Sequence, residues 1–374
     1  MKQRTFNILL TVLFCLFIGG MFLGSLILPD RDFSQLENRK LAQTPALSLE
    51  NITTGKFMED AEDYVNDQIL GRDFWVALKA WSERVSGKQE NNGVYFAEEN
   101  TLISRVDTPE QSTLDTNAGY VNALVDNVDV PVYFGIIPSA AEIWSDRLPE
   151  GAPTADEKAI IDRLYNEVQT HTIDLYSALA QHKDEGIYYR TDHHWTSLGA
   201  YYGYTALMDA MGLEAVPLDE SQKVTVSENF YGTLFSSSGV RWLPPDHIDR
   251  YISDEGVTVT SYPNGTPEPG SLYVDSYLEV KDKYSSFLGG NKPLCVIETE
   301  HTDAPKVLVI RDSYADSLAP FLTQNFSEIH LFDPRYNLTS VKDYVTQNEI
   351  DSVVVLYSIS NFTAKDNQMF VLGR

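Results

Sequence analysis

Cysteine is scarce in this chain of 374 residues, which contains only Cys15 and Cys295. Cys15 lies within a long apolar stretch near the N-terminus, so the rest of the chain holds one thiol and cannot form an internal disulfide. This excludes a small secreted scaffold held together by disulfides. An exported bacterial protein that folds without disulfides fits the composition better.

Positive charge is also in short supply. The chain has 28 Lys and Arg residues against 54 Asp and Glu residues, which gives a formal net charge of −26. Such an acidic balance disfavours polyanionic partners, both nucleic acid and acidic lipid surfaces. Hydrophobic residues make up 43% of the chain and aromatic residues 11%, so the composition is that of a folded protein rather than a disordered one.

Charged residues and proline are absent from residues 6–28, which are mostly apolar. A helix of this length, rising about 1.5 Å per residue, crosses a hydrocarbon core of about 30 Å. Lys2 and Arg4 precede the segment, so the positive-inside rule predicts a cytoplasmic N-terminus and an extracytoplasmic remainder. A cleaved signal peptide is the alternative, although its apolar region normally covers about 7–15 residues.

The sequence predicts four segments in order. Residues 1–5 form a cytoplasmic tail, 6–28 a transmembrane anchor, 29–55 a proline-containing polar stalk, and 56–374 one extracytoplasmic domain. Within that domain, apolar residues at three- and four-residue spacing predict a helix over residues 56–86. Residues 213–300 contain short alternating stretches rich in Gly, Pro and Ser, which we interpret as a β-rich insertion over one end of a sheet.

The remaining pattern alternates apolar β-rich runs with helical periodicity, which predicts an α/β fold around a largely parallel sheet. Buried strands are expected at residues 130–138, 306–310, 329–332 and 352–357. Helices are expected at residues 155–169, 197–211, 316–325 and 340–348.

The hexapeptide at residues 191–196 is the most unusual in the chain, because it places Asp192, His193, His194 and Trp195 directly before a predicted helix. In an extended segment, alternate residues share a face, so Asp192 and His194 would point one way and His193 the other. A carboxylate that orients an imidazole general base needs that arrangement.

Structural explanations of the same residues remain open. Asp192 could be an acid beside the positive end of a helix dipole, Trp195 a core aromatic, and the histidines hydrogen-bonded structural groups. A metal site is not expected, because no third ligand stands at a recognisable interval.

A second candidate segment is the predicted strand at residues 307–310, which is followed by Arg311, Asp312 and Ser313 and then by a helix. Ser313 would stand at the carboxyl end of a parallel strand, where open α/β sheets bind ligands. The helix N-terminus would supply backbone N–H groups for a developing oxyanion. The alternative is that Asp312 or Ser313 only caps the helix.

Asp-His-His-Trp at residues 192–195, followed more than a hundred residues later by a strand and Arg-Asp-Ser-Tyr, resembles the DHHW proteins of Gram-positive bacteria. These proteins are similar to the SGNH-hydrolase-like domains of alginate O-acetyltransferases. The resemblance extends to residues 37–39, 67–72, 93–95 and 287–291. It implies an SGNH-hydrolase-like three-layer sandwich with Ser313 as nucleophile, His194 as general base and Asp192 as the carboxylate that orients it.

The chain departs from the usual Gly-Asp-Ser block by carrying Arg311 at the glycine position. The oxyanion contacts of the family therefore cannot simply be copied onto this sequence. Candidates for oxyanion or substrate contacts are Gly289, Gly290, Asn291, Asn361 and Arg311 itself. The loops that carry the glycines and asparagines could equally be ordinary turns.

The resemblance implies a membrane-anchored, extracytoplasmic O-acetyltransferase that needs no cofactor and acts on a cell-surface polysaccharide or exopolysaccharide through an acyl-Ser313 intermediate. Because acetyl-coenzyme A is cytosolic, it also implies a multi-pass membrane-bound O-acyltransferase as the acetyl donor. Two alternatives remain: a carbohydrate esterase with the same triad, and a non-catalytic envelope scaffold or glycan-binding protein. The sequence does not specify the polymer or the acyl group.

Overall fold

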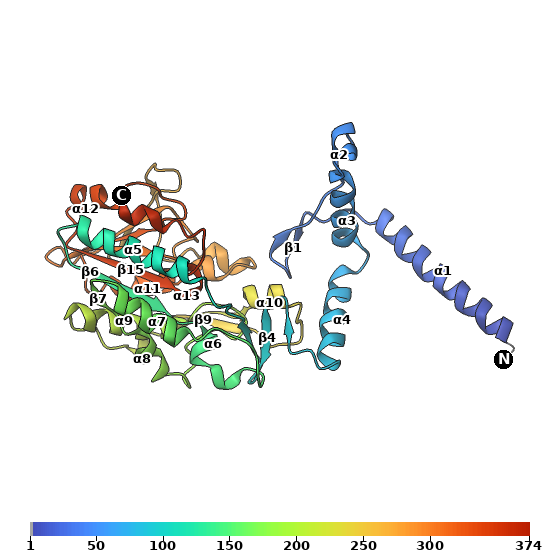
Figure 1. The fold of residues 1–374 in the computed structure, drawn as a ribbon, viewed down its shortest axis with the longest axis horizontal. Coiled ribbons are helices and arrows are strands. Elements are labelled where there is room, and N and C mark those ends of the chain that lie inside the picture. The colour runs from blue at the N-terminus through green and yellow to red at the C-terminus, as the bar shows by residue number, and fades with distance from the viewer. Residues whose placement is uncertain (1–2) are drawn as a thin grey trace. The chain divides into compact units, whose positions relative to one another are not determined.

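The computed structural model of the protein describes residues 3–374 (Figure 1). The chain divides into two compact units, of which the first comprises Met1–Asn91 and Phe235–Trp242 and the second Asn92–Leu234 and Leu243–Arg374. The sequence predicts a single domain from residue 56 onward, whereas residues 56–91 lie in the first unit. The second unit carries the sheet and both sequence motifs.

The first unit begins with an apolar helix, α1, over Gln3–Ile27, none of whose residues is buried. Among residues 3–374 it is the one helix long and apolar enough to cross a membrane, which suits a signal anchor or a signal peptide. The other elements of this unit are β1 (Phe33–Ser34), β2 (Arg39–Lys40), α2 (Leu49–Thr53), α3 (Lys56–Gln68), α4 (Arg72–Val85) and β3 (Glu90–Asn91).

The single helix predicted over residues 56–86 is wrong in one respect, because the structure has two helices there, α3 and α4. Ile69 is extended, with φ −60° and ψ 139°, and Gly71 adopts a left-handed conformation with φ 68°. Neither conformation continues an α-helix. Apolar spacing alone cannot show this break, since it continues across both helices.

Partly buried ion pairs hold the segment after α1 against α3 and α4. Glu37 accepts from the guanidinium of Arg72 at 2.7 Å, and Arg39 forms a bidentate pair with Asp67. Asp67 also accepts from the Ala42 amide at 2.8 Å. Residues 37–39 and 67–72 therefore act together in stabilising this unit.

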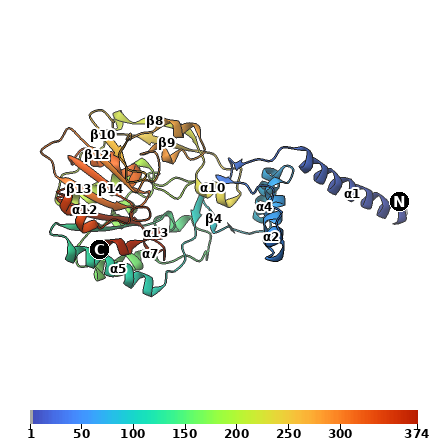
Figure 2. The same cartoon turned by 90° about the horizontal axis from the view of Figure 1, so that it is seen from above.

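The core of the second unit is an eight-stranded sheet in the order β11-β10-β12-β14-β13-β15-β6-β7. The strands from β14 to β7 are mutually parallel, and β12, β10 and β11 extend the sheet antiparallel at one edge (Figure 2). Their bounds are β6 Val132–Ile137, β7 His171–Thr172, β10 Thr258–Ser261, β11 Glu268–Pro269, β12 Leu294–Glu298, β13 Lys306–Arg311, β14 Glu328–Phe332 and β15 Ser352–Ser358. All four predicted strands are confirmed, as β6, β13, β14 and β15.

Residues 213–300 contribute to this sheet directly, through β10, β11 and β12. The same segment also contains a separate antiparallel pair, β8 (Val224–Phe230) with β9 (Asp246–Arg250). A further antiparallel pair joins β4 (Val94–Ala97) to β5 (Thr101–Ser104). The predicted insertion is therefore β-rich, and part of it forms one edge of the central sheet.

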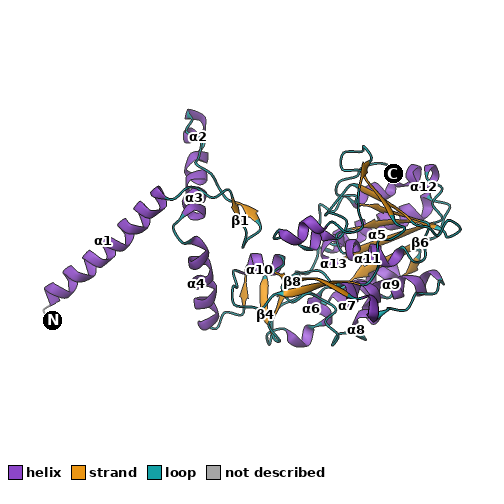
Figure 3. Cartoon of the chain, turned by 180° about the vertical axis from the view of Figure 1, so that it is seen from behind, coloured by secondary structure: helices purple, strands orange, loops and turns teal. Residues whose placement is uncertain are grey.

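Helices cover both faces of the sheet and give the predicted three-layer α/β sandwich (Figure 3). Side chains alternate along each strand, so Val307 and Val309 of β13 enter one core while Leu308 and Ile310 enter the other. One face packs against α5, α7, α12 and α13, and the other against α8, α9 and α11. The helices are α5 Gln111–Asn127, α6 Ala140–Ile143, α7 Glu157–Glu167, α8 Leu175–Ala180, α9 Ser197–Met211, α10 Thr233–Ser238, α11 Ala315–Leu322, α12 Val341–Gln347 and α13 Ile359–Phe362.

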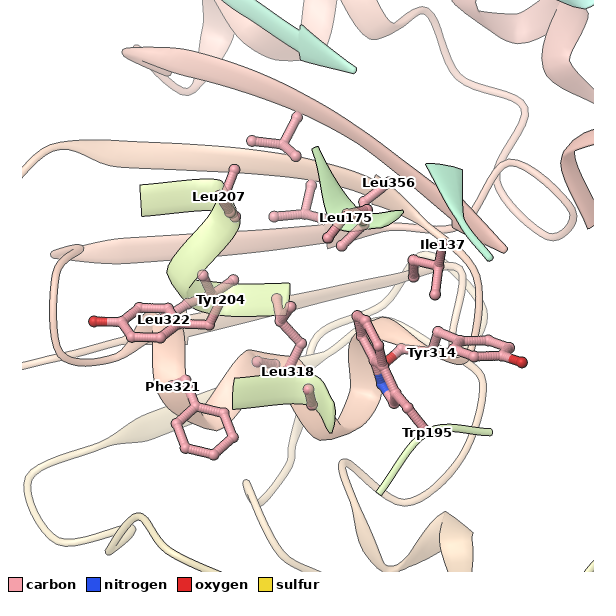
Figure 4. Close-up of a cluster of buried hydrophobic side chains, with 14 of the residues drawn as sticks. Ile137, Leu175, Trp195, Tyr204, Leu207, Tyr314, Leu318, Phe321, Leu322 and Leu356 are labelled. Atoms are coloured by element: carbon pink, nitrogen blue, oxygen red, sulfur yellow. The ribbon is translucent and has the colours of Figure 1, made fainter. Parts of the chain in front are cut away.

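Trp195 belongs to the core between α9 and α11 and is completely buried (Figure 4). Its indole N–H donates to the Tyr314 carbonyl at 2.9 Å and to the Ser317 hydroxyl at 3.0 Å. A Cβ at Gly203 of α9 would lie 2.7 Å from the indole ring, so this glycine makes room for it. The tryptophan of the motif thus anchors the loop before α9 to the start of α11.

The buried carboxyl of Glu157, the first residue of α7, should make the stability of the protein depend on pH. Glu157 is fully buried, and burial raises the pKa of its carboxyl to about 7 from 4.5, although Ser139 donates to it from its hydroxyl at 2.5 Å and its amide at 2.7 Å. A group whose pKa is raised by folding contributes its full stability at pH values below its pKa in the unfolded state. That stability is lost as pH rises through its pKa in the folded state. We expect the free energy of unfolding to fall by about 2 to 3 kcal/mol between pH 5 and pH 8 from this group.

Denaturant unfolding of Glu157→Gln measures this effect, because the amide keeps the shape of the side chain and cannot ionise. The variant should show a flatter dependence of unfolding free energy on pH than the unaltered protein. If the unfolding free energies of the variant and of the unaltered protein changed equally with pH, Glu157 would be ionised in both the folded and the unfolded state over this range.

Candidate active site

The Asp-His-His-Trp loop is held between a short bridge and a helix cap. Tyr188 pairs with Trp195 as an isolated antiparallel bridge, and the Thr196 hydroxyl accepts from the Gly199 amide at 3.2 Å, which caps α9. Residues between these points follow a series of bends rather than an extended strand. The loop is therefore fixed at both ends, and its backbone is irregular in between.

Ser313 lies in the turn between β13 and α11, at the carboxyl end of a central parallel strand. The preceding Asp312 is completely buried and ties this turn to the end of β15. Its carboxylate accepts from the Ser358 hydroxyl at 2.6 Å, the Asn361 side-chain amide at 2.8 Å and the Tyr314 amide at 3.0 Å. Asp312 thus positions the turn, which leaves the Ser313 side chain available for another partner.

The structure brings Ser313, His194 and Asp192 into one hydrogen-bonded chain. His194 Nε2 lies 2.8 Å from the Ser313 hydroxyl oxygen, and His194 Nδ1 lies 2.6 Å from Asp192 Oδ1. Asp192 and His194 are buried, with 3% and 6% exposure. This is the order of contacts that a serine nucleophile, an imidazole base and an orienting carboxylate require.

Four hydrogen bonds fix the Asp192 carboxylate. Oδ1 accepts from the His194 ring and from the His194 amide at 3.0 Å, while Oδ2 accepts from the Thr233 amide at 2.7 Å and the Thr233 hydroxyl at 3.1 Å. Burial by itself would raise the pKa of Asp192. The nearby His193 and His194 and the Thr233 amide nevertheless hold that pKa well below its usual range. The carboxylate therefore remains ionised at neutral pH.

Tyr284 and Thr233 are site residues that the sequence analysis missed. The Tyr284 ring stacks on the His194 imidazole with centroids 3.8 Å apart and an interplanar angle of 11°. Its hydroxyl donates to the Ser313 carbonyl at 3.0 Å, so one side chain holds both the imidazole plane and the serine turn. Neither residue stands in a motif or at a regular spacing from residues 192–194, and no sequence signal could have found them.

The expectation that His193 points away from Asp192 is wrong. His193 Nδ1 lies 3.5 Å from Asp192 Oδ1 and 2.7 Å from the Thr233 hydroxyl, and its ring lies 3.9 Å from that of His194. Alternation of faces applies to extended strands, whereas this loop bends at each residue. Both histidines consequently lie on the same side as the carboxylate.

The predicted oxyanion residues occupy different surroundings. Arg311 is completely buried and pairs with Asp316 at 2.9 Å, and its Nη1 also lies 3.4 Å from Asn291 Oδ1. Asn361 donates one N–H to Asp312. These contacts commit the Arg311 guanidinium to the interior and tie Asn291 and Asn361 to the residues that surround the serine turn.

Gly289 and Gly290 form a left-handed turn with φ of 75° and 79°. The Gly289 carbonyl accepts from Lys292 at 2.6 Å, and the Gly290 amide donates to the Phe287 carbonyl at 3.4 Å. Within residues 3–374, the backbone N–H of Ser313 donates no hydrogen bond. This N–H group is therefore a free hydrogen-bond donor on the serine itself. The sequence analysis did not include it among the predicted oxyanion contacts.

Asp192, His193 and His194 could each offer one ligand atom to a metal ion, and these atoms lie within 4.8 Å of one another. The Nδ1 atoms of both histidines and both oxygens of Asp192 already take part in the hydrogen bonds described above. A metal ion bound through these atoms would have to displace the hydrogen bonds that hold the Asp192 carboxylate and the His194 ring. The arrangement suits acid-base chemistry better.

Gly232 provides a test of how closely Asp192 must be held. A Cβ added at this position would lie 2.2 Å from Asp192 Cβ and 2.3 Å from Oδ2, so the carboxylate would have to move. If Asp192 orients the His194 imidazole, a small displacement of the carboxylate should be costly, and Gly232→Ala should lower the rate of reaction at Ser313 about tenfold to a hundredfold. Gly119→Ala, in a helical position with open space around it, is the matched control and should leave activity unchanged. Full activity in Gly232→Ala would show that Asp192 tolerates movement.

A family model described as "DHHW protein" matches residues 110–332, more than half of the chain and including both motifs. This chain belongs to the DHHW protein family. The structure of a DHHW family protein from Eubacterium siraeum is 27% identical, with a TM-score of 0.66, and covers 75% of this chain and 95% of that one. Bacillus cereus PatB1, solved with a sulfonyl adduct, is 21% identical with a TM-score of 0.62 over 75% and 98% of the two chains, and shows the shared fold.

Among curated proteins, the DHHW chain is similar to the probable alginate O-acetylase AlgJ of Pseudomonas syringae pv. tomato. The two are 24% identical over an alignment of 247 residues, and the match covers 61% of this chain. The chain spans 60% of the length of that relative.

Proposed function

We propose that this DHHW protein is an extracytoplasmic O-acetyltransferase that acts on polysaccharide hydroxyls through an acetyl-Ser313 intermediate. The supporting observation is the continuous hydrogen-bonded chain from Asp192 through His194 to Ser313 at the carboxyl end of β13. The similarity to an alginate O-acetylase supports the acyl group and the substrate class.

The reaction would proceed in two balanced halves. In the first, His194 Nε2 takes the Ser313 proton while Oγ attacks the acetyl carbonyl of the donor, and His194 then returns the proton to the departing group. In the second, an acceptor hydroxyl loses its proton to His194 Nε2 and attacks the Ser313 ester. The tetrahedral intermediate then collapses and releases Ser313 Oγ, which takes the proton back from His194 Nε2.

Each half forms a negatively charged tetrahedral oxygen that needs hydrogen-bond donors. The free backbone N–H of Ser313 supplies one of them. The Asn361 amide has two N–H groups and gives one to Asp312, so its second is available. The turn at Gly289 and Gly290 and the Asn291 side chain are further candidates for donors or for substrate contacts, whereas the Arg311 guanidinium acts through its charge from within the interior.

We further propose that α1 is an uncleaved anchor with its N-terminus in the cytoplasm. None of its residues is buried in the structure, and most of its large apolar side chains are exposed, which is unfavourable in water and favourable in a bilayer. An acetyl donor from the cytosol must then cross the membrane. A multi-pass membrane-bound O-acyltransferase would deliver it to Ser313.

Labelling with phenylmethylsulfonyl fluoride tests whether the serine is activated. Mass spectrometry of the full chain in detergent should place one sulfonyl group on Ser313, and Asp192→Asn should label more slowly than the unaltered protein but faster than His194→Ala. The absence of labelling at Ser313 would favour a non-catalytic scaffold or glycan-binding protein.

Acetyl transfer from p-nitrophenyl acetate to polysaccharides then separates transferase from esterase. A transferase should release p-nitrophenol faster when an acceptor glycan is present and should yield acetylated glycan. Acetate release that is independent of any glycan would assign the chain as an esterase with the same triad.

A further inference from the structure

The two adjacent histidines of the motif face one carboxylate oxygen. Nδ1 of His194 lies 2.6 Å from Asp192 Oδ1, and Nδ1 of His193 lies 3.5 Å from the same atom. The ring centroids are 3.9 Å apart, with an interplanar angle of 36°. Nε2 lies on the other side of an imidazole ring from Nδ1, and the two rings lie against each other, so both Nε2 atoms should lie on the side away from Asp192.

The hydrogen bonds of Thr233 fix the tautomer of neutral His193. A hydroxyl has one proton, and Thr233 donates it to Asp192 Oδ2. The Thr233 oxygen therefore accepts from His193 Nδ1–H at 2.7 Å. In a neutral imidazole with Nδ1 protonated, Nε2 carries a lone pair and is a hydrogen-bond acceptor.

The Nε2 atom of His193 is open to an incoming molecule. Its side chain is 39% exposed, and Nε2 has no hydrogen-bond partner within residues 3–374. Partial burial and the neighbouring His194 lower the pKa of His193, with Asp192 opposing the change, so the ring is neutral near pH 7. An acceptor nitrogen thus stands beside the nitrogen of His194 that contacts Ser313.

We propose that the paired Nε2 atoms of His193 and His194 bind two adjacent hydroxyls of one sugar ring, so that the site selects a vicinal diol over water. The reacting hydroxyl would give its proton to His194 Nε2 as its oxygen bonds to the acetyl carbon. The neighbouring hydroxyl would donate a hydrogen bond to His193 Nε2 and keep its proton. The oxygens of a vicinal diol are separated by only three bonds, which suits two acceptors on adjoining rings.

This inference rests on the proposed function and names the acceptor class of the same site. Water can fill only one of the two positions at a time. A simple alcohol reaches His194 and leaves the acceptor on His193 to water, so it makes one contact fewer with the protein and binds less tightly in the transition state than a diol. His193 thereby contributes to specificity, and Thr233 is a positioning residue that acts through His193 and Asp192.

The experiment compares trans-1,2-cyclohexanediol with cyclohexanol as acceptors, with p-nitrophenyl acetate as donor and the full chain in detergent. The unaltered protein should transfer acetyl to the diol with a kcat/KM about tenfold above that for cyclohexanol, the size expected of one additional hydrogen bond. In His193→Asn, the amide can still donate to Thr233 from the Nδ1 position but has no group at Nε2. The preference should fall to about twofold, mainly through a higher KM for the diol.

The rate of sulfonyl labelling of Ser313 distinguishes the two roles of His193. If His193 only held the site in place, its replacement would lower this rate as much as it lowers the preference for the diol. In His193→Asn, the labelling rate should fall much less than the preference for the diol. Thr233→Val should lower the labelling rate several-fold, because Asp192 loses a donor, and Thr233→Ser should restore it. His301→Asn, an exposed histidine elsewhere in the second unit, is the matched control and should change neither measurement.

Three results would overturn the inference. Equal use of diol and cyclohexanol by the unaltered protein would show that no diol is recognised. A parallel loss of labelling and preference in His193→Asn, with an unchanged melting temperature, would restrict His193 to positioning Asp192. Failure of the unaltered protein to label Ser313 would instead remove the proposed function itself, and the inference with it.

Discussion

Ser313→Ala and His194→Ala should each lower kcat/KM for acetyl transfer by about a thousandfold or more. In the proposed mechanism, Ser313 Oγ and His194 Nε2, which lie 2.8 Å apart, act as nucleophile and base, so the loss of either would remove the covalent route. For the same reason, the double variant should be no worse than the single ones. Product formation from p-nitrophenyl acetate and an acceptor glycan measures the effect.

Controls for this prediction are Ser360→Ala and His301→Ala, which replace exposed residues of the same types. Circular dichroism should show an unchanged mixed α/β spectrum for the double variant and for all four single variants. Substantial activity in Ser313→Ala would assign the chemistry to another group. A loss in His301→Ala as large as that in His194→Ala would remove the special role of the motif histidine.

Arg311→Met should destabilise the second unit by about 3 kcal/mol at pH 8. Arg311 is completely buried and pairs with Asp316 at 2.9 Å, and its removal leaves a buried carboxylate without a counter-charge. Burial already raises the pKa of Asp316 to about 6, against the opposing effect of Arg311. Without the guanidinium this pKa should rise further, so the carboxyl should accept a proton at a higher pH than in the unaltered protein.

The sign of the pH dependence follows from that raised pKa. The stability that Asp316 contributes is present at pH values below its pKa in the unfolded state and is lost as pH rises through its pKa in the folded state. The variant should therefore lose less free energy of unfolding at pH 5 than at pH 8. Denaturant unfolding at both pH values measures the difference. Arg311→Met combined with Asp316→Asn is the matched control and should recover much of the loss. A double variant less stable than the single one would contradict this account.

Several elements were predictable because their physical cause is local. Buried strands such as β13 and β15 have continuous apolar runs between polar segments, and α9 lies between a capping threonine and a left-handed Gly212. The break between α3 and α4 was not predictable, since it depends on the backbone conformation of Ile69 and Gly71 within a continuing apolar pattern.

The site was predictable only in part. Ser313 at a strand end and Asp192 beside His194 stand out in the sequence, and family resemblance pairs them. The direction of His193 could not be inferred, because the bends of its loop depend on contacts of Trp195 and Tyr314 with distant parts of the core. Tyr284 and Thr233 reach the site from irregular segments that carry no periodic signal.

The sequence by itself determined the apolar N-terminal helix, the absence of disulfides outside it, the α/β class and the residue types available for catalysis. Each of these follows from composition or from short-range periodicity. Only the tertiary structure decided that Arg311 is neutralised by Asp316 and that Thr233 holds Asp192. It likewise decided that His193 and His194 lie side by side. The Thr233–Asp192 and Ser313–His194 contacts join residues 41 and 119 positions apart, so they depend on how the sheet and its helices pack. Arg311 and Asp316 are close in sequence, but they meet only because β13 and α11 fold back across a tight turn.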